Sequence, residues 1–361
     1  MNAHVPARRR LMASAMSLAA WSSSTALSVL GLGPSGAAQA APGPAPDQTA
    51  GVQFPIIVLN SRDADVSLIH PVTYAVMGRV PTGKEPHHLY PMPDNKLVVV
   101  GNAMSDSLTV LDPASGRVAM SIPGIDDPYH LGFSPDQSYF VTCANRLDHV
   151  DVYHRTGQGD RFALRGATRF NLAKTPSHLV FTDDSRVVFC TLQESDELVA
   201  IDLRKLVVLW RFKIGRLPAG VAISPDSKLV FVGCMGENSV QVIEPRLGNT
   251  AGPRLIASIK TGEGAHAFRN HGNKRHLWVS NRMANTVSKL DMSTLKVEAE
   301  IAVPGGPDCM DVHESGKQLW VTQRWTRSVS LVDLDQSRVV KRIGVGRSPH
   351  GVYLHDRADL L

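Results

Sequence analysis

Apolar and polar residues alternate along short segments from residue 54 to the end of the chain. Residues 97–101, 108–112 and 118–122 form one group of such segments, and the turn sequence Pro93-Asp94-Asn95 lies just before it. Alternation with a period of two, bounded by turn residues, is typical of strands and not of helices. The pattern therefore predicts an all-β protein.

The strand groups repeat, and each group begins with the same short landmark. The landmark is a Pro or Gly, then any residue, then a small residue or His, and successive copies are 42 to 48 residues apart. The copies are Pro86-His87-His88, Pro128-Tyr129-His130, Pro176-Ser177-His178, Pro218-Ala219-Gly220, Gly264-Ala265-His266, Pro307-Asp308-Cys309 and Pro349-His350-Gly351. Four strands in each repeat of this length are typical of β-propeller blades.

The two ends of the chain complement each other. The segment 56–60 matches the second strand of a repeat and has no first strand before it, whereas the last landmark is followed by one strand, 350–355. Joined, the ends make one complete blade, and closing a ring in this way removes exposed sheet edges. We therefore predict a single seven-bladed propeller over residues 54–356. Each blade has four antiparallel strands, the ring is closed by pairing the N-terminal strands with the C-terminal strand, and residues 357–361 form a tail.

Several segments resemble a known repeat. Residues 218–232, the run Trp278-Val279-Ser280-Asn281 and the run Asn285-Thr286-Val287 resemble the YVTN β-propeller repeat. The resemblance covers residues 52–356. Over this range the chain is similar to YncE-like periplasmic β-propellers, which are related to the propeller of cytochrome d1 proteins. The resemblance implies the propeller fold and makes haem a candidate ligand. The sequence has no C-x-x-C-H motif, so it predicts no covalently attached haem.

The first forty residues resemble an export signal. Arg8, Arg9 and Arg10 precede a moderately apolar stretch, which ends in the cleavage pattern Ala38-Gln39-Ala40. The arginines favour a twin-arginine signal peptide over residues 1–40, with an ordinary Sec signal as the alternative. Residues 41–53 are then a flexible N-terminal segment. We expect a periplasmic protein without a membrane span, because no later run of 18 apolar residues occurs.

Charge and cysteine content narrow the function classes. Without the three arginines of the signal, 35 basic residues face 33 acidic ones, so nucleic-acid binding is not expected. The cysteines are widely spaced, without a zinc-type C-x-x-C, and we favour buried free thiols over disulfides. They are Cys143, Cys190, Cys234 and Cys309. We expect a monomer.

The landmarks predict a ring of histidines at one mouth of the central channel. Its members are His87, His88, His130, His178, His266 and His350. Imidazoles can ligate a metal or a haem iron, or transfer protons. His88, His130 and His178 occupy one register in neighbouring blades and are the candidate metal ligands. The alternative is that duplication copied a histidine that only hydrogen-bonds a neighbouring loop.

A second ring is predicted from the loops between the second and third strands. It contains four arginines together with amide and aromatic side chains: Arg62, Arg146, Arg282, Arg324, Asn60, Asn102, Asn281, Gln323 and Trp325. Guanidinium groups beside histidines favour a carboxylate or phosphate ligand. The arginines would alternatively pair with loop acids such as Asp63, Asp65, Asp126, Asp127 and Asp148, and the amides would satisfy loop backbone groups.

Three functions follow from these residues. The first is a binding or scaffold protein, whose His- and Arg-rich mouth holds an anionic small molecule or a periplasmic protein partner. The second is haem or metal binding similar to that of cytochrome d1 proteins, with a histidine on the iron and the arginines on the propionates. The third is a lactonase- or lyase-like enzyme. No catalytic residue is assigned, because no recognised catalytic motif is present.

Overall fold

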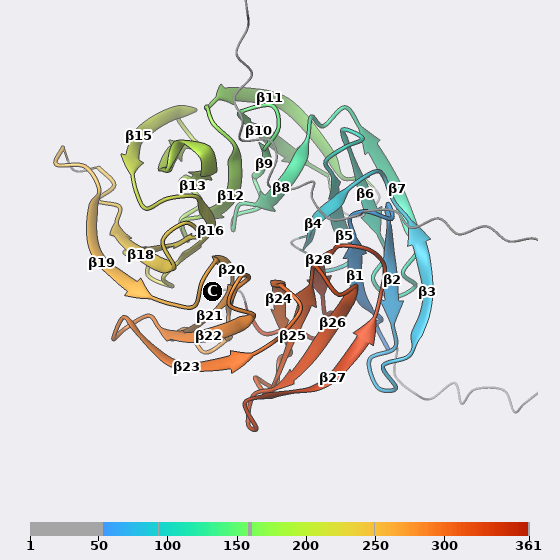
Figure 1. Cartoon of the computed structure of the whole chain (residues 1–361). Coiled ribbons are helices and arrows are strands. Elements are labelled where there is room, and N and C mark those ends of the chain that lie inside the picture. The colour runs from blue at the N-terminus through green and yellow to red at the C-terminus, as the bar shows by residue number, and fades with distance from the viewer. Residues whose placement is uncertain (1–52, 93, 158–160, 249, 360–361) are drawn as a thin grey trace, which may run out of the picture. The chain divides into compact units, whose positions relative to one another are not determined.

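The computed structural model describes residues 53–359 apart from 93, 158–160 and 249. The predicted signal peptide and almost all of the predicted flexible segment lie outside the described residues. Within that part of the chain, the residues form seven four-stranded antiparallel sheets, numbered here as blades along the chain (Figure 1). Among these residues, no helix has the length and apolar composition needed to span a bilayer.

The first three blades are given with their strands from the inside outward. Blade 1 consists of β28 (Pro349–Tyr353), β1 (Ile56–Asn60), β2 (Asp65–Ile69) and β3 (Val76–Pro81). Blade 2 consists of β4 (Pro86–Pro91), β5 (Val98–Asn102), β6 (Ser107–Leu111) and β7 (Val118–Pro123). Blade 3 consists of β8 (Pro128–Phe133), β9 (Tyr139–Ala144), β10 (His149–Thr156) and β11 (Ala163–Asn171).

The other four blades repeat the same order. Blade 4 consists of β12 (Pro176–Phe181), β13 (Val187–Leu192), β14 (Glu197–Asp202) and β15 (Val207–Lys213), with the 3-10 helix η3 (Gln193–Ser195) between β13 and β14. Blade 5 consists of β16 (Pro218–Ile223), β17 (Val230–Cys234), β18 (Ser239–Glu244) and β19 (Arg254–Lys260). Blade 6 consists of β20 (Ala265–Asn270), β21 (His276–Asn281), β22 (Thr286–Asp291) and β23 (Lys296–Ala302). Blade 7 consists of β24 (Pro307–Val312), β25 (Gln318–Gln323), β26 (Ser328–Asp333) and β27 (Arg338–Gly344).

The ring closes through blade 1, which combines both ends of the propeller. The C-terminal strand β28 pairs antiparallel with β1, with Ile57 opposite Tyr353 and Asn60 opposite Pro349. Each innermost strand also contacts the innermost strand of the next blade, all the way round the central axis (Figure 1). The predicted seven-bladed fold and its mode of closure are confirmed.

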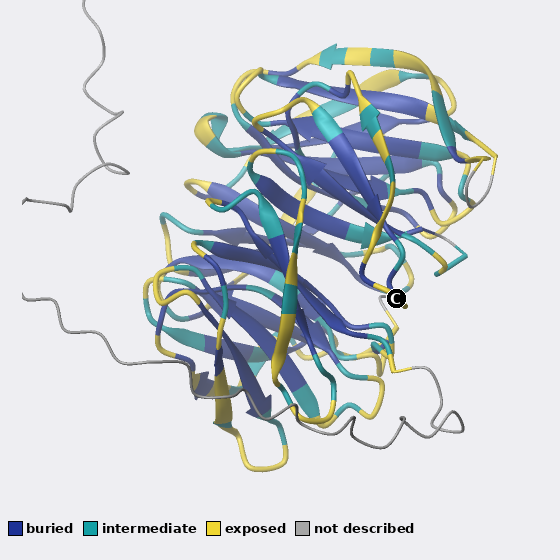
Figure 2. Cartoon of the chain, turned by 90° about the vertical axis from the view of Figure 1, so that its right-hand side faces the viewer, coloured by how far each residue is buried: buried dark blue, intermediate teal, exposed yellow. Residues whose placement is uncertain are grey.

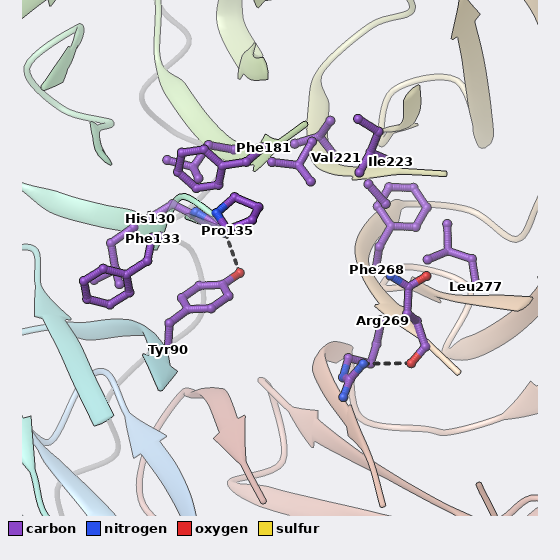
Figure 3. Close-up of a pocket in the computed structure, with 16 residues that line it drawn as sticks. Tyr90, His130, Phe133, Pro135, Phe181, Val221, Ile223, Phe268, Arg269 and Leu277 are labelled. Atoms are coloured by element: carbon purple, nitrogen blue, oxygen red, sulfur yellow. Dashed lines mark hydrogen bonds between the residues drawn. The ribbon is translucent and has the colours of Figure 1, made fainter. Parts of the chain in front are cut away.

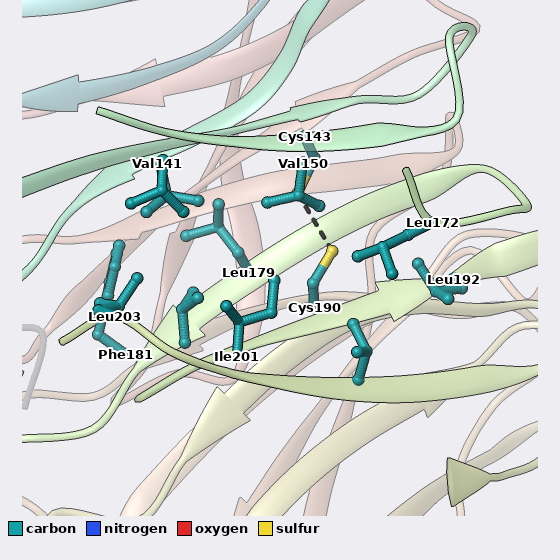
Figure 4. Packing of buried hydrophobic residues seen from close by; sticks show 13 residues of the cluster. Val141, Cys143, Val150, Leu172, Leu179, Phe181, Cys190, Leu192, Ile201 and Leu203 are labelled. Atoms are coloured by element: carbon teal, nitrogen blue, oxygen red, sulfur yellow. Dashed lines mark hydrogen bonds between the residues drawn. The ribbon is translucent and has the colours of Figure 1, made fainter. Parts of the chain in front are cut away.

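The core lies between the blades. Each pair of neighbouring blades encloses a cluster of buried apolar side chains, so the described residues contain seven such clusters. Between blades 3 and 4, Val141 and Val150 face Leu179 and Ile201 (Figure 4). The second and third strands are buried almost throughout because blades cover both of their faces, whereas outer strands such as β7 alternate toward solvent (Figure 2).

An acidic turn reinforces the closure of the ring. Asp63, between β1 and β2, accepts a hydrogen bond of 2.8 Å from the backbone N–H of Arg347, just before β28. Its carboxylate also pairs with the guanidinium groups of Arg347 and Arg79. Partial burial opposes ionisation of Asp63, but the bonds from Arg347 and Arg79 outweigh it and lower the pKa to about 2. One carboxylate thus joins the N-terminal and C-terminal parts of blade 1.

Substituting Asp63→Asn should weaken this closure. We expect the free energy of unfolding at pH 7 to fall by about 1 kcal/mol, because the charged hydrogen bonds to Arg347 are lost from a partly exposed site. Since the folded pKa is depressed, the difference from wild type should be complete above pH 4 and disappear as the pH falls toward 2. Urea denaturation across this pH range measures it.

The matched control is Asp335→Asn, which removes an exposed ion pair of 3.6 Å with Lys317 on the surface of blade 7. This variant should unfold like wild type at every pH. Equal effects of the two substitutions would contradict a closing role for Asp63.

Candidate functional site

The six predicted histidines all lie on innermost strands, close to the axis of the ring. His87 and His88 lie on β4, and His130, His178, His266 and His350 lie on β8, β12, β20 and β28. We call this group the central histidine cluster. Each ring centroid lies 3.7–5.3 Å from that of its nearest neighbour in the cluster. The structure therefore brings together side chains from five blades.

A local backbone irregularity accompanies this convergence. Most of these strands begin with Pro, which donates no ladder hydrogen bond and is tolerated at the first position of a strand. The pairing with the second strand then shifts register between Pro86 and Leu89 in blade 2 and between Pro176 and Leu179 in blade 4. Such bulges re-aim the residues within them. His87, His88 and His178 lie in these bulges.

The cluster is buried, whereas the sequence analysis placed it at an open channel mouth. Its members are at most 5% exposed. Tyr129, which precedes His130, stacks on the ring of His87 with a centroid distance of 3.8 Å. The innermost strands meet so closely at the axis that neighbouring blades remove these side chains from solvent. The histidines therefore form an internal centre and not an open ring.

Burial also keeps the imidazoles neutral. It lowers the pKa of His130 to about 3, with a further contribution from His266. It lowers the pKa of His266 to about 4, and the Arg282 guanidinium acts in the same direction. Burial holds the pKa well below the usual range in the other members, His87, His88, His178 and His350. Neutral imidazoles retain a lone pair, which is the form that ligates metals.

Several members of the cluster use one ring nitrogen for an outer hydrogen bond. His350 Nδ1 lies 2.6 Å from the carbonyl oxygen of His87, His178 Nδ1 lies 3.0 Å from Ser177 Oγ, and His130 Nε2 lies 3.1 Å from Tyr90 Oη. The other nitrogen of each ring is buried and has no hydrogen-bond partner among the described residues. His88 Nε2 and His87 Nδ1 share this condition. Unsatisfied buried nitrogens are costly, so their accumulation needs an explanation.

An acid that the sequence analysis overlooked lies beside the cluster. Asp308 is fully buried, and its carboxylate lies 2.7 Å from Arg282, 3.4 Å from Arg324 and 3.0 Å from His266 Nδ1. Burial opposes ionisation of Asp308, but Arg282, His350 and His266 hold its pKa well below the usual range. The sequence could have indicated this role, because Asp308 is part of a landmark and therefore lies on a buried inner strand.

Asp308 changes the roles expected for two arginines and one histidine. Arg282 and Arg324 approach the cluster as predicted, but both pair with this carboxylate. His266 Nε2 lies 2.8 Å from Arg282 Nη2, while its Nδ1 faces Asp308. Both nitrogens of His266 are therefore engaged. The Nε2 atom of His350 also faces the Asp308 carboxylate, at 3.6 Å.

The two remaining arginines lie elsewhere. Arg146 contacts Asp127 through its side chain at 3.3 Å and donates to the carbonyl of Ala103 at 2.7 Å. Asp127 is one of the loop acids that the sequence analysis offered as an alternative partner. Arg62 is exposed, and its carbonyl accepts a hydrogen bond from Arg347. The structure therefore does not arrange the four arginines in a ring around one ligand, as the sequence analysis predicted.

The predicted amide residues stabilise the blades. Asn60, Asn102, Asn281 and Gln323 are fully buried. Asn102 donates to Thr109 Oγ1 of the next strand at 2.9 Å, and Asn60 accepts from the N–H of Gly346 at 2.9 Å. A Cβ atom at Gly346 would lie 2.7 Å from that of Asn60, so this approach requires glycine. These amides satisfy loop and strand groups instead of facing the axis, whereas Trp325 is 52% exposed.

The cysteines occupy two kinds of position. Cys143, Cys190 and Cys234 are buried in strands, and the Sγ atoms of Cys143 and Cys190 lie 3.2 Å apart between blades 3 and 4 (Figure 4). Cys309 is partly buried, and its Sγ lies 3.4 Å from His350 Nδ1 and 4.0 Å from His88 Nδ1. Burial raises the pKa of Cys309 well above its usual value. A thiol thus borders the central histidine cluster.

Comparisons with known proteins agree with this architecture. A protein-family model described as a YNCE-like beta-propeller matches residues 12–360. A structure of a functionally unknown protein from Desulfotomaculum acetoxidans DSM 771 is 13% identical, with a TM-score of 0.71 over 83% of this chain and 98% of that chain. The dihydro-heme d1 dehydrogenase NirN in complex with DHE is also 13% identical, with a TM-score of 0.62 over 87% of this chain and 78% of that chain. No curated protein matches the sequence.

Substituting Asp308→Asn should destabilise the propeller strongly. The amide cannot balance Arg282 and Arg324, and breaking a buried pair by removing one charge costs about 3–5 kcal/mol. Urea denaturation at pH 7 measures this loss. The control is Asp335→Asn, which removes an exposed partner of Lys317 and should change stability little. A loss below about 1 kcal/mol for Asp308→Asn would contradict the assigned role.

Proposed function

We propose that this chain, which belongs to the YNCE-like β-propeller family, is a metal-binding propeller. The central histidine cluster holds a divalent transition-metal ion at the axis of the ring. This choice takes up the metal-binding alternative expected from the sequence, in place of a scaffold role or an anionic ligand. The fold alone does not select it, because propellers of the same architecture support many functions.

One observation supports the proposal above all others. His130 and His178 each have one nitrogen at an outer hydrogen-bond partner and a second, buried nitrogen without one among the described residues. His350 Nδ1 also has an outer partner, and its Nε2 lies 3.6 Å from the Asp308 carboxylate. Metal-binding histidines have this arrangement, because the outer bond selects the tautomer and orients the ring. A bound ion would satisfy the nitrogens that are otherwise costly to bury.

The spacing of the nitrogens supports the same conclusion. Two triads, His87–His88–His350 and His88–His130–His178, each have their potential ligand atoms within 4.8 Å of one another, and His88 belongs to both. A tetrahedral ion with nitrogen bonds of about 2.0–2.1 Å needs its ligands roughly 3.4 Å apart. Small rotations of buried rings would close this difference.

The donor set favours a metal of intermediate softness. Imidazole suits zinc, copper, iron and nickel, and among divalent ions copper binds nitrogen sites most tightly. The Cys309 thiol next to His350 adds a soft donor at the edge of the site. Asp308 offsets one of the two positive charges of Arg282 and Arg324 and so weakens their repulsion of a cation. We therefore expect Cu²⁺ or Zn²⁺ in the cluster.

A haem fits these residues poorly. A macrocycle needs open space beside its axial histidine, but the six rings are packed against one another and are at most 5% exposed. Arg282 and Arg324 pair with Asp308, so the groups expected to meet propionates are already engaged. The similarity to NirN concerns the fold, since the two chains are 13% identical.

We also propose that the protein is exported to the periplasm. Support comes from residues 1–40, where three arginines, an apolar stretch and an Ala-x-Ala pattern follow one another. A twin-arginine route would allow folding, and metal loading, before export.

The metal site is tested with the His88→Ala variant. His88 contributes to both triads, so its loss should weaken Cu²⁺ or Zn²⁺ binding by about a hundredfold or more. Calorimetric titration of metal-free protein, together with elemental analysis, measures affinity and stoichiometry. The control is His154→Ala on the exposed side of β10, which should bind like wild type. Metal affinity unchanged by His88→Ala would contradict the proposal.

The export route is tested by replacing Arg8, Arg9 and Arg10 of the full chain with Lys. This change keeps the positive charge that a Sec signal needs but removes the arginine pair. We expect wild type in the periplasmic fraction, shortened at its N-terminus, and the Lys variant retained in the cytoplasm. Export of the Lys variant would point to the Sec route, and retention of wild type in the cytoplasm would refute export.

A further inference from the structure

A separate cavity lies beside the central histidine cluster, among the innermost strands. It measures about 200 Å³ and is lined by five successive inner strands, β4, β8, β12, β16 and β20 (Figure 3). Its lining is mainly apolar and includes the rings of Phe133, Phe181 and Phe268. Tyr90 and His130 form one side, and Arg269 lies on the opposite side (Figure 3).

We propose that this cavity binds a small, uncharged aromatic molecule that carries a hydrogen-bonding oxygen. The site goes beyond the proposed metal function, because none of its contacts requires an ion. Ligand sites are usually apolar pockets with a few converging polar groups, and this cavity has that composition.

The size of the cavity limits the ligand to about one ring. An apolar cavity of about 150 Å³ accommodates benzene in another protein, so 200 Å³ suits a single substituted ring. Aromatic rings pack edge-to-face or offset against one another, and the three phenylalanines offer such contacts. The shape therefore favours a planar six-membered ring over a longer chain.

Tyr90 provides the polar contact for the oxygen of the ligand. Its hydroxyl lies 3.1 Å from His130 Nε2. With the proton of His130 on Nε2, this hydrogen bond runs from His130 to the Tyr90 oxygen, and the tyrosine proton is free to bond a ligand.

The positive charge of Arg269 at the cavity is already paired with Asp311, which disfavours an anionic ligand. Arg269 pairs with Asp311 at 2.7 Å and donates to the carbonyls of Asn270, Ala358 and Asp359. These contacts occupy most of its donors and tie the C-terminal segment to blade 6. A carboxylate in the cavity would lose its hydration without gaining a new ion pair, so the ligand is uncharged.

The test is titration of the metal-free full-length protein with phenol, followed by calorimetry and ligand-observed NMR. We expect saturable binding at one site with a dissociation constant of about 1 mM or lower. Toluene should bind more weakly because it lacks the oxygen, and benzoate should not bind. Binding of benzoate as tight as that of phenol, or the absence of saturable phenol binding, would overturn the proposal.

Two variants locate the binding site. Val180→Phe adds a ring to the cavity lining and should weaken phenol binding at least tenfold, whereas Val208→Phe on the exposed outer strand β15 should not. Tyr90→Phe should weaken phenol binding about fivefold and leave toluene binding unchanged. Phenol binding that neither Val180→Phe nor Tyr90→Phe reduces would place the ligand elsewhere and refute this site.

The outcome does not depend on whether the protein binds metal. His88→Ala lies outside the cavity lining and should retain phenol affinity even if it loses metal. Phenol binding without metal binding would refute only the proposed function. Metal binding without phenol binding would refute only the cavity ligand.

Discussion

The closure of the ring is the constraint on which the other features depend. Each blade has two apolar faces, and each face is buried only when a neighbouring blade covers it. The first blade supplies this cover to both ends of the array, but it exists only when β28 pairs with β1. Two segments at opposite ends of the propeller must therefore meet before the last two interfaces form. Asp63, which bonds Arg347, reinforces that meeting with charge.

Closure also explains why so many histidines share one small volume. A ring of radial sheets brings the starts of its innermost strands close to one axis, whatever residues the strands carry. In a solvent-filled channel those residues would be hydrated and independent. Here they are buried, so the protonation state and hydrogen bonding of each residue depend on those of its neighbours. In the described residues, neutral imidazoles surround one carboxylate that pairs with two guanidinium groups.

The central histidine cluster and the cavity lie at different positions along the innermost strands. Histidines near the start of these strands form the polar cluster, whereas Phe133, Phe181 and Phe268 farther along line an apolar space. His130 belongs to both, since its ring borders the cavity and its Nδ1 is buried in the cluster. The hydrogen bond to Tyr90 is the one direct polar link that we identify between the two regions in the described chain. A ligand in the cavity would therefore lie next to a ligand of the proposed metal ion.

The amino-acid sequence by itself determined the number of blades, their strands and the way the ring closes. These features follow from local alternation and from a repeat that returns every 42 to 48 residues, so they are visible without knowledge of distant contacts. The landmarks of the same repeat identified the six histidines, four in one register and two in the preceding one. Only the tertiary structure decided that they are buried, that Asp308 joins His266 to Arg282 and Arg324, and that the amides of Asn60 and Asn102 serve the blades. The physical reason is that burial and pairing depend on side chains from separate blades, whose approach is set by bulges and by the curvature of the closed ring, and a one-dimensional pattern contains neither.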